Sequence, residues 1–419
     1  MVIKISPKIR RTHLHFSDFL FLLGLFLKQF YLRQSGTMQM GDVCMMTAVV
    51  LLVISQRRAF FNIDLPLAVF VLFTFVINGL YTLYYHKNFV MSSVYLLYNL
   101  LAVIAFRVFI QKEDFVKALV ITLKLNLMTQ VLVYFSDFGR MFGSIRYQGT
   151  FNDPNQFGFF VLCSFFMLFL CYYYKGSHFP LVWYLVAGFL VLISASRGMM
   201  LAFLIFLFFA VIQPYLAGKD PITQYVCFIL LAIAVAFYLW GGTKLLALVS
   251  GLHNRQIDNL ITRFEEGSSE SNRLSDKIFN FLSNRYMLRV VYMPIYLIFG
   301  SGEGYYGRFL LIERRPGEIH GTMVALWYYY GITPYLFFLK WIWNNLKGLP
   351  SRAWGVFIAI ILEACTLANH RQPLFWTMFV MGSLIAGKER QEKKSIVYEN
   401  YVQRDRTGVP GERLYREMH

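Results

Sequence analysis

Long apolar stretches recur along almost the whole chain, and short polar turns separate them. Most stretches approach the ~20 residues that a helix needs to cross a hydrocarbon layer of ~30 Å. Two of them are short and flank the turn SASRG, so this pair could also form a tilted or partly re-entrant hairpin. The pattern predicts about twelve membrane-spanning helices, centred on residues 16–31, 38–54, 65–85, 89–110, 115–135, 157–174, 180–193, 199–212, 222–240, 323–343, 353–367 and 373–385.

The composition supports a protein that lies in a bilayer. Of the 419 residues, 57% are hydrophobic and only 15% are charged, whereas soluble chains are about a quarter charged. The start, MVIKISPKIRRTHLHF, is basic and then apolar, with no small-residue cleavage site after it. We therefore expect an uncleaved first helix and an all-α polytopic membrane protein.

Lys and Arg in the short loops predict the orientation, because cytoplasmic loops retain positive charge. With the N-terminus in the cytoplasm, most of the net charge of +17 falls in inner loops and in the tail KERQEKK. Nucleic-acid binding is the competing explanation, but the charge is scattered rather than gathered into one stripe. The expected parts are membrane helices over 1–240, a large extracytoplasmic loop with amphipathic helices over 241–321, membrane helices over 322–387 and a solvated cytoplasmic tail over 388–419.

The same alternation puts the unusual polar turns on the outer face. The turn SIRYQGTFNDPNQFG carries Arg146, Asn152 and Asn155. Arg197 belongs to SASRG, and Arg371 belongs to NHRQP. Lipid head groups or local salt bridges explain any single arginine equally well. Arginines in these three turns and in the long outer loop over 241–321 favour an anionic ligand such as phosphate or pyrophosphate.

The large loop is expected to contain helices that lie on the membrane surface. Leu274, Ile278 and Leu282 recur every four positions, which is typical of an amphipathic helix. We expect such loop helices to carry Arg285 and Arg289. The glycines of GSGEGYYG follow no predicted strand and lie outside the cell, so they do not indicate a nucleotide-binding loop.

His320 is the main candidate for a general base on the outer face. It follows Glu318 at the entrance of a predicted helix, and a histidine with a pKa near ~6.5 can accept a proton from a hydroxyl group. An interfacial histidine satisfied by water or by Glu318 is the simpler explanation, and His253 and His370 are further candidates on this face. The five cysteines are isolated, and C-x-x-C, H-E-x-x-H and D-x-D motifs are absent. We therefore expect no metal.

Four motifs follow one another in the second half of the chain. RYQGTFNDPNQFG precedes one span, SASRG precedes another, and a large loop ends in GSGEG before EIHGTMVALWYYYGI. Their order and spacing over residues 146–376 resemble the bacterial O-antigen polymerase and ligase superfamily. The resemblance implies a glycosyltransferase-C-like enzyme of the bacterial cytoplasmic (inner) membrane that needs no cofactor. Its donor would be a glycan on polyprenyl pyrophosphate and its acceptor a second glycolipid, with membrane lipids and a chain-length regulator as partners.

The resemblance also implies roles for single residues. His320 matches the family histidine that deprotonates the attacking hydroxyl group, and Arg197 matches the arginine of the SRG turn. Arg285 best fits the arginine that holds the departing pyrophosphate. Gly321 departs from the family pattern, which often has a polar residue there, so the acceptor contacts stay open. The remaining substrate-binding candidates are Arg146, Asn152, Asn155, Arg289 (the alternative to Arg285), Glu318 and Arg371.

Three functions stay open. A polymerase of surface polysaccharide, either O-antigen or capsule, is preferred for the motif around His320 and for Tyr305, Tyr306 and Trp327, which could stack on sugars. The aromatic belt of membrane proteins explains most such residues equally well. A ligase would instead transfer the glycan to lipid A core. A transporter of lipid-linked glycan is the alternative that is not an enzyme, but Lys124 is the clearest mid-span charge and the chain has no internal repeat.

Overall fold

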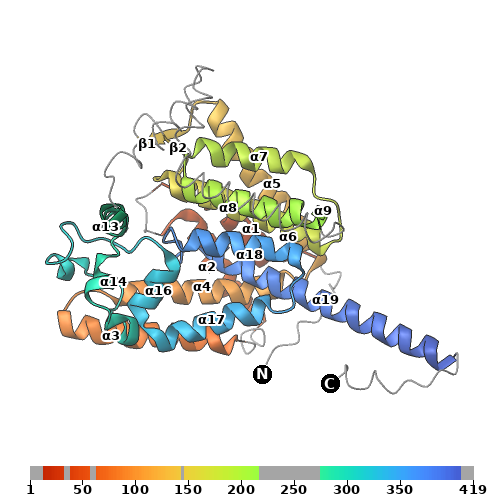
Figure 1. Ribbon diagram of the computed structural model, residues 1–419. Coiled ribbons are helices and arrows are strands. Elements are labelled where there is room, and N and C mark those ends of the chain that lie inside the picture. Colours follow the sequence, from red (N-terminus) through yellow and green to blue (C-terminus); the bar gives the residue numbers. More distant parts are fainter. Residues whose placement is uncertain (1–12, 33–37, 57–62, 143–145, 217–273, 407–419) are drawn as a thin grey trace.

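The computed structural model describes residues 13–32, 38–56, 63–142, 146–216 and 274–406. These residues are mostly helical, with one antiparallel two-stranded hairpin (Figure 1). The elements are α1 (Phe16–Leu27), α2 (Met40–Ser55), α3 (Leu65–Tyr85), α4 (Val90–Phe109), α5 (Glu113–Phe135), β1 (Arg140–Phe142), β2 (Arg146–Gly149), α6 (Pro154–Tyr174), α7 (Leu181–Ile193), α8 (Arg197–Leu207), the π-helical turn η2 (Phe208–Ile212), α9 (Gln213–Leu216), α13 (Leu274–Asn284), α14 (Leu288–Tyr292), α15 (Tyr296–Phe299), the 3₁₀ turn η4 (Tyr306–Phe309), α16 (Thr322–Tyr330), α17 (Ile332–Leu346), α18 (Ser351–Ala364) and α19 (Pro373–Arg406).

Among the described helices, four are long and apolar enough to cross a membrane, namely α3, α4, α5 and α6. Helices α1, α2, α7 and the continuous α8–η2 are apolar but shorter. The expected span over 222–240 lies outside the described residues. The expectation of a helical protein with membrane-spanning helices is therefore supported, and the number twelve stays a prediction.

Helix α6 forms the centre of the helical body. Within its most apolar window 89% of the residues are buried, compared with 28% in α3. It packs against α5, α7, α8 and α19, and its uncharged sequence, rich in Phe and Leu, suits an environment without water. Helix α3 exposes the apolar side chains of Leu72, Val76, Leu80 and Leu83, as expected for a helix with one face in contact with lipid.

The polar turns and the tail helix lie at opposite ends of the body. Figure 1 shows the long helices side by side, with β1, β2, α13 and α14 at one end. The C-terminal half of α19 projects from the other end. Residues 388–406, expected to be a solvated tail, thus continue α19 as helix, and residues 391–395 are exposed. Glu, Gln, Lys and Arg favour helix, and no proline interrupts the segment.

The span expected over 323–343 is divided into α16 and α17 at Gly331. Gly331 has φ 75° and ψ 175°, a conformation that is essentially restricted to glycine. A Cβ atom there would lie 2.4 Å from the carbonyl oxygen of Ile298. The N–H groups of Ser301 and Gly302 donate to the last carbonyl groups of α16, at 3.0 and 2.8 Å. Because α16 ends at this break, its last carbonyl groups accept hydrogen bonds from the GSGEG turn.

Candidate functional site

Hydrogen bonds connect the turn that contains Arg146 to the SASRG turn. The guanidinium group of Arg146 donates to the carbonyl oxygen of Ser194 at 3.3 Å and to Oδ1 of Asn155 at 2.7 Å. The Ser196 hydroxyl group donates to the same Asn155 oxygen at 3.0 Å. Arg146 is only 7% exposed. Both expected substrate-binding residues, Arg146 and Asn155, thus make contacts that position the two turns.

The same turn also begins α6. The side chain of Asp153 accepts hydrogen bonds from the backbone N–H groups of Asn155 and Gln156, at 2.7 and 3.4 Å, and so caps the helix. Asn152 accepts a hydrogen bond from Arg140 of β1 at 3.1 Å. Asn152 is therefore held by the hairpin.

Three residues expected to act in catalysis come together near Thr366. Arg285 follows α13 directly and donates to the carbonyl oxygen of Thr366. Arg197 is the first residue of α8, and a Cβ atom on the next residue, Gly198, would lie 2.8 Å from Oγ1 of Thr366. The backbone N–H of His320 donates to the carbonyl oxygen of Arg285 at 3.0 Å. Residues 35 to 123 positions apart in the sequence thus form one cationic site with a histidine.

Burial and the charges of this site shift the pKa values of Arg285 and His320. Burial and the neighbouring Arg197 both lower the pKa of Arg285. Burial and then the Arg285 charge lower the pKa of His320, although Asp153 acts in the opposite direction. Because its pKa falls below the ordinary 6.5, the imidazole of His320 is neutral at pH 7 and can accept a proton. This cationic site can therefore hold an anion beside a general base.

Gly321, which departs from the family pattern, has a structural reason to be glycine. Its φ of 132° lies in a region that favours glycine, and a Cβ atom would lie 2.6 Å from the carbonyl oxygen of Cys365. The next residue, Thr322, donates its backbone N–H to the carbonyl oxygen of Leu367 at 3.0 Å. The close approach fixes the chain that carries His320 against the segment that carries Thr366.

Arg289 lies elsewhere and is neutralised within the protein. It belongs to α14, is fully buried, and forms an ion pair with Glu313. It also donates to the carbonyl oxygen of Gly317 at 2.7 Å, and its guanidinium carbon lies 4.4 Å from the ring centre of Phe309. Of the two arginines left open by the sequence, the geometry favours Arg285 as the ligand of an anion.

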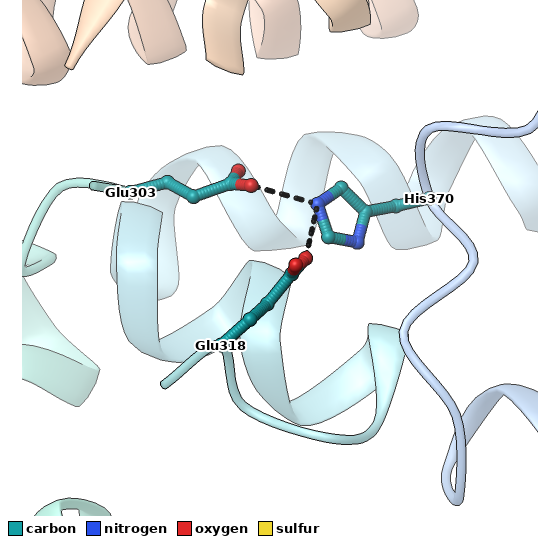
Figure 2. A group of neighbouring side chains, drawn as sticks. All are labelled: Glu303, Glu318 and His370. Atoms are coloured by element: carbon teal, nitrogen blue, oxygen red, sulfur yellow. Dashed lines mark hydrogen bonds and ion pairs between the residues drawn. The ribbon is translucent and has the colours of Figure 1, made fainter. Parts of the chain in front are cut away.

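A second polar cluster surrounds Glu303 in the GSGEG turn (Figure 2). The buried Glu303 carboxylate accepts hydrogen bonds from Nε2 of His370 at 3.0 Å, from Arg371 at 2.5 Å and from the Tyr330 hydroxyl group at 2.7 Å. Glu318 lies 3.7 Å from His370 and 3.5 Å from Arg371. Burial raises the pKa of Glu303, but His370 and Arg371 outweigh it and hold that pKa below its usual range.

The ligand atoms of Glu303, Glu318 and His370 all lie within 4.8 Å of one another, close enough to hold a metal ion. Arg371, however, forms ion pairs with both carboxylates and supplies the positive charge that a metal would bring. The two carboxylates therefore have a cationic partner within the described residues. Glu318 and Arg371 connect the GSGEG turn to the segment before α19, and their expected contact with substrate stays a prediction.

Glu303 was not among the site residues expected from the sequence. The sequence around it contains a clue, because a carboxylate between two glycines at the edge of an apolar helix needs a cationic partner. The three aromatic residues expected near His320 have other contacts. Trp327 donates to the carbonyl oxygen of Leu297 at 2.9 Å, Tyr306 lies beside Arg289, and Tyr305 packs on Tyr85. His253 lies outside the described residues.

A comparison of the sequence with protein-family models finds no match. A comparison with curated proteins finds no match either. The sequence motifs and the geometry of the cationic site are therefore the features from which a function can be proposed.

Proposed function

We propose that the protein is a membrane glycosyltransferase that joins polyprenyl-pyrophosphate-linked oligosaccharide repeat units into surface polysaccharide. The observation that carries the proposal is the meeting of Arg197, Arg285 and His320 in one cationic site. Three residues that the family resemblance assigns to catalysis come from three separate segments, so their proximity is not a consequence of sequence neighbourhood.

The chemistry that we propose needs a base and a stabilised leaving group. A hydroxyl oxygen of the acceptor attacks the anomeric carbon of the donor sugar and forms the new glycosidic bond. The bond from that carbon to the phosphate oxygen breaks, and the pyrophosphate leaves with the electron pair. His320 takes the proton of the hydroxyl group, and Arg197 and Arg285 stabilise the negative charge on the leaving group. The lowered pKa of His320 supports its role as the base.

The experiment is a reconstituted assay with polyprenyl-pyrophosphate-linked repeat units, read as a ladder of glycan lengths and as released polyprenyl pyrophosphate. We expect His320→Ala to abolish both products. His178 lies exposed between α6 and α7, and His178→Ala is the matched control that should retain activity. A normal ladder from His320→Ala would overturn the assignment.

A ligase differs in its acceptor, which would be lipid A core. A deletion strain distinguishes the two enzymes. Core that carries a single repeat unit indicates loss of a polymerase, and bare core with accumulated lipid-linked polymer indicates loss of a ligase. Polymerase remains our proposal because of the sequence around His320.

A transporter would move lipid-linked glycan across vesicles without forming a glycosidic bond. Two ionisable residues of the described helices that a transport pathway would use, Lys124 of α5 and Glu363 of α18, make contacts within the protein. Lys124 lies 5.5 and 5.7 Å from the ring centres of Tyr172 and Trp183, and Glu363 accepts a hydrogen bond from Asn369 at 2.9 Å. These contacts favour structural roles over a transport pathway.

A further inference from the structure

Arg308, in the turn η4, is surrounded by aromatic rings. Its guanidinium carbon lies 4.7 Å from the ring centre of Phe309, 4.9 Å from that of Phe89 and 5.1 Å from that of Tyr81. Tyr85 adds a fourth ring at 5.6 Å. The rings exclude water from the sides of the cation and favour its charge through their π electrons.

The hydrogen bonds of Arg308 are incomplete within the described part of the chain. Nη2 donates to the carbonyl oxygen of Gly302 at 2.8 Å. Nε and Nη1 are buried and have no acceptor among the described residues. No carboxylate in those residues forms an ion pair with Arg308, unlike Arg289 and Arg371, which are paired with Glu313 and Glu303. A partly buried guanidinium group with two free donors requires an acceptor beyond those that the described residues supply.

A second cation and an apolar surface adjoin this group. Lys87 is exposed, and its Nζ lies 5.6 Å from the ring centre of Tyr305, which packs on Tyr85. Leu83, near the end of α3, is 73% exposed, and Leu311, just after η4, is fully exposed. Because α3 is long and apolar enough to cross a membrane, exposed apolar side chains near its end suit contact with acyl chains.

We propose that Arg308 binds the phosphate group of a membrane lipid, with Lys87 as the second cation. A guanidinium group presents its donors as a planar fork that matches two phosphate oxygens. The exposed leucines contact the hydrocarbon chains of the same lipid. The site is separate in its residues from the cationic site of Arg197, Arg285 and His320, and it does not depend on glycosyl transfer.

Two lipids carry this chemistry, a bilayer phospholipid and the phosphorylated polyprenol. The experiment uses the purified full chain in detergent and measures lipid binding by native mass spectrometry. One arm compares dioleoylphosphatidic acid with dioleoylglycerol, which differ only in the phosphate group. The other arm compares undecaprenyl phosphate with undecaprenol. The arm with the greater preference for the phosphorylated member identifies the source.

We expect the wild-type chain to prefer a phosphorylated lipid by at least about tenfold, as charge-assisted hydrogen bonds to phosphate permit. Arg308→Gln should remove this preference and leave the binding of the alcohols unchanged. Arg308→Lys keeps the charge without the fork and should reduce the preference severalfold, which tests the proposal even if Arg308→Gln does not fold. Arg314→Gln, at an exposed position of the same loop, should match the wild type.

Three results would overturn the proposal. One is an undiminished phosphate preference in Arg308→Gln or Arg308→Lys. Another is an equal loss in Arg314→Gln, which would indicate attraction by the general surface charge. The third is a wild-type chain that binds the alcohols as tightly as the phosphorylated lipids.

Discussion

The backbone N–H of His320 donates to the carbonyl oxygen of Arg285 at 3.0 Å. This hydrogen bond joins the residue proposed as general base to one of the residues proposed to hold pyrophosphate. Because this hydrogen bond holds the two backbones together, the proposed base and the proposed leaving-group ligand stay close to each other. Catalysis by proximity and orientation requires such an arrangement. The bond also brings the Arg285 charge close enough to lower the pKa of the His320 imidazole.

Separate substitutions of Arg285 and Arg289 should have different effects. The first should lower the activity, and the second should lower the stability. Arg285→Gln removes a proposed ligand of the leaving group, so we expect the glycan-forming rate to fall by about 100-fold or more. Thermal unfolding should change little, because Arg285 is only partly buried and donates one hydrogen bond to Thr366.

Arg289→Gln leaves the buried carboxylate of Glu313 without its counter-ion. We expect it to lower the free energy of unfolding by about 3–5 kcal/mol, measured by chemical denaturation in detergent. The proposed roles would be wrong if the two variants exchanged these effects.

The titration of His320 can be followed without activity. Diethyl pyrocarbonate reacts with the neutral form of an imidazole and not with the protonated form. The rate of modification at His320, measured by peptide mass spectrometry, therefore reports the pKa of His320. The rate should be half-maximal below pH 6.5 in the wild type, because burial and Arg285 lower the pKa. Arg285→Gln removes a positive charge and should move the midpoint up. Asp153→Asn removes the opposing negative charge and should move it down.

If both variants kept the wild-type midpoint, neither charge would act on the imidazole.

The glycan-forming rate should follow the same midpoint. It should be lost as the pH falls through the lowered pKa, because the base is then protonated.

Glu303→Gln should destabilise the protein because it leaves His370 and Arg371 around a neutral amide. We expect a loss of about 3–5 kcal/mol in the free energy of unfolding. Glu318→Gln is the matched control and should cost less, since the Glu318 side chain is 28% exposed and its contacts are longer.

The pH dependence follows from the lowered pKa of Glu303. Its contribution to stability is present above the ordinary glutamate pKa of about 4.3 and is lost as the pH falls through the folded value. The difference in stability between wild type and Glu303→Gln should therefore persist from about pH 8 to 5, because the Glu303 carboxylate stays ionised over this range. A difference that vanished within this range would contradict the ion network.

Gly331→Ala tests the division between α16 and α17. The conformation of Gly331 costs other residues about 1–3 kcal/mol, and the added Cβ atom would meet the carbonyl oxygen of Ile298 at 2.4 Å. We expect a loss of at least about 2 kcal/mol in the free energy of unfolding. Gly79→Ala in α3, where a Cβ atom has no neighbour within 4 Å, should be neutral or stabilising. Equal effects of the two substitutions would show that the break is not needed.

Hydrophobic periodicity determined most of the fold. The expected span over 65–85 coincides with α3, and the helix expected from Leu274, Ile278 and Leu282 corresponds to α13. Apolar runs predict helices because a backbone away from water must satisfy its own hydrogen bonds. The break at Gly331 was not predicted, because it depends on the Ile298 backbone, which packs there only in the folded chain.

For the site, the sequence by itself selected the residues that we propose to carry the chemistry. Arg197, Arg285 and His320 were selected from their motifs, and the order of those motifs pointed to one outer face. Only the tertiary structure decided which candidates lie against one another. It paired Arg289 with Glu313 and left Arg308 without a carboxylate among the residues that the structure describes. The physical reason is that an ion pair depends on distances of a few ångströms between distant segments, and a hydrophobic pattern does not encode those distances.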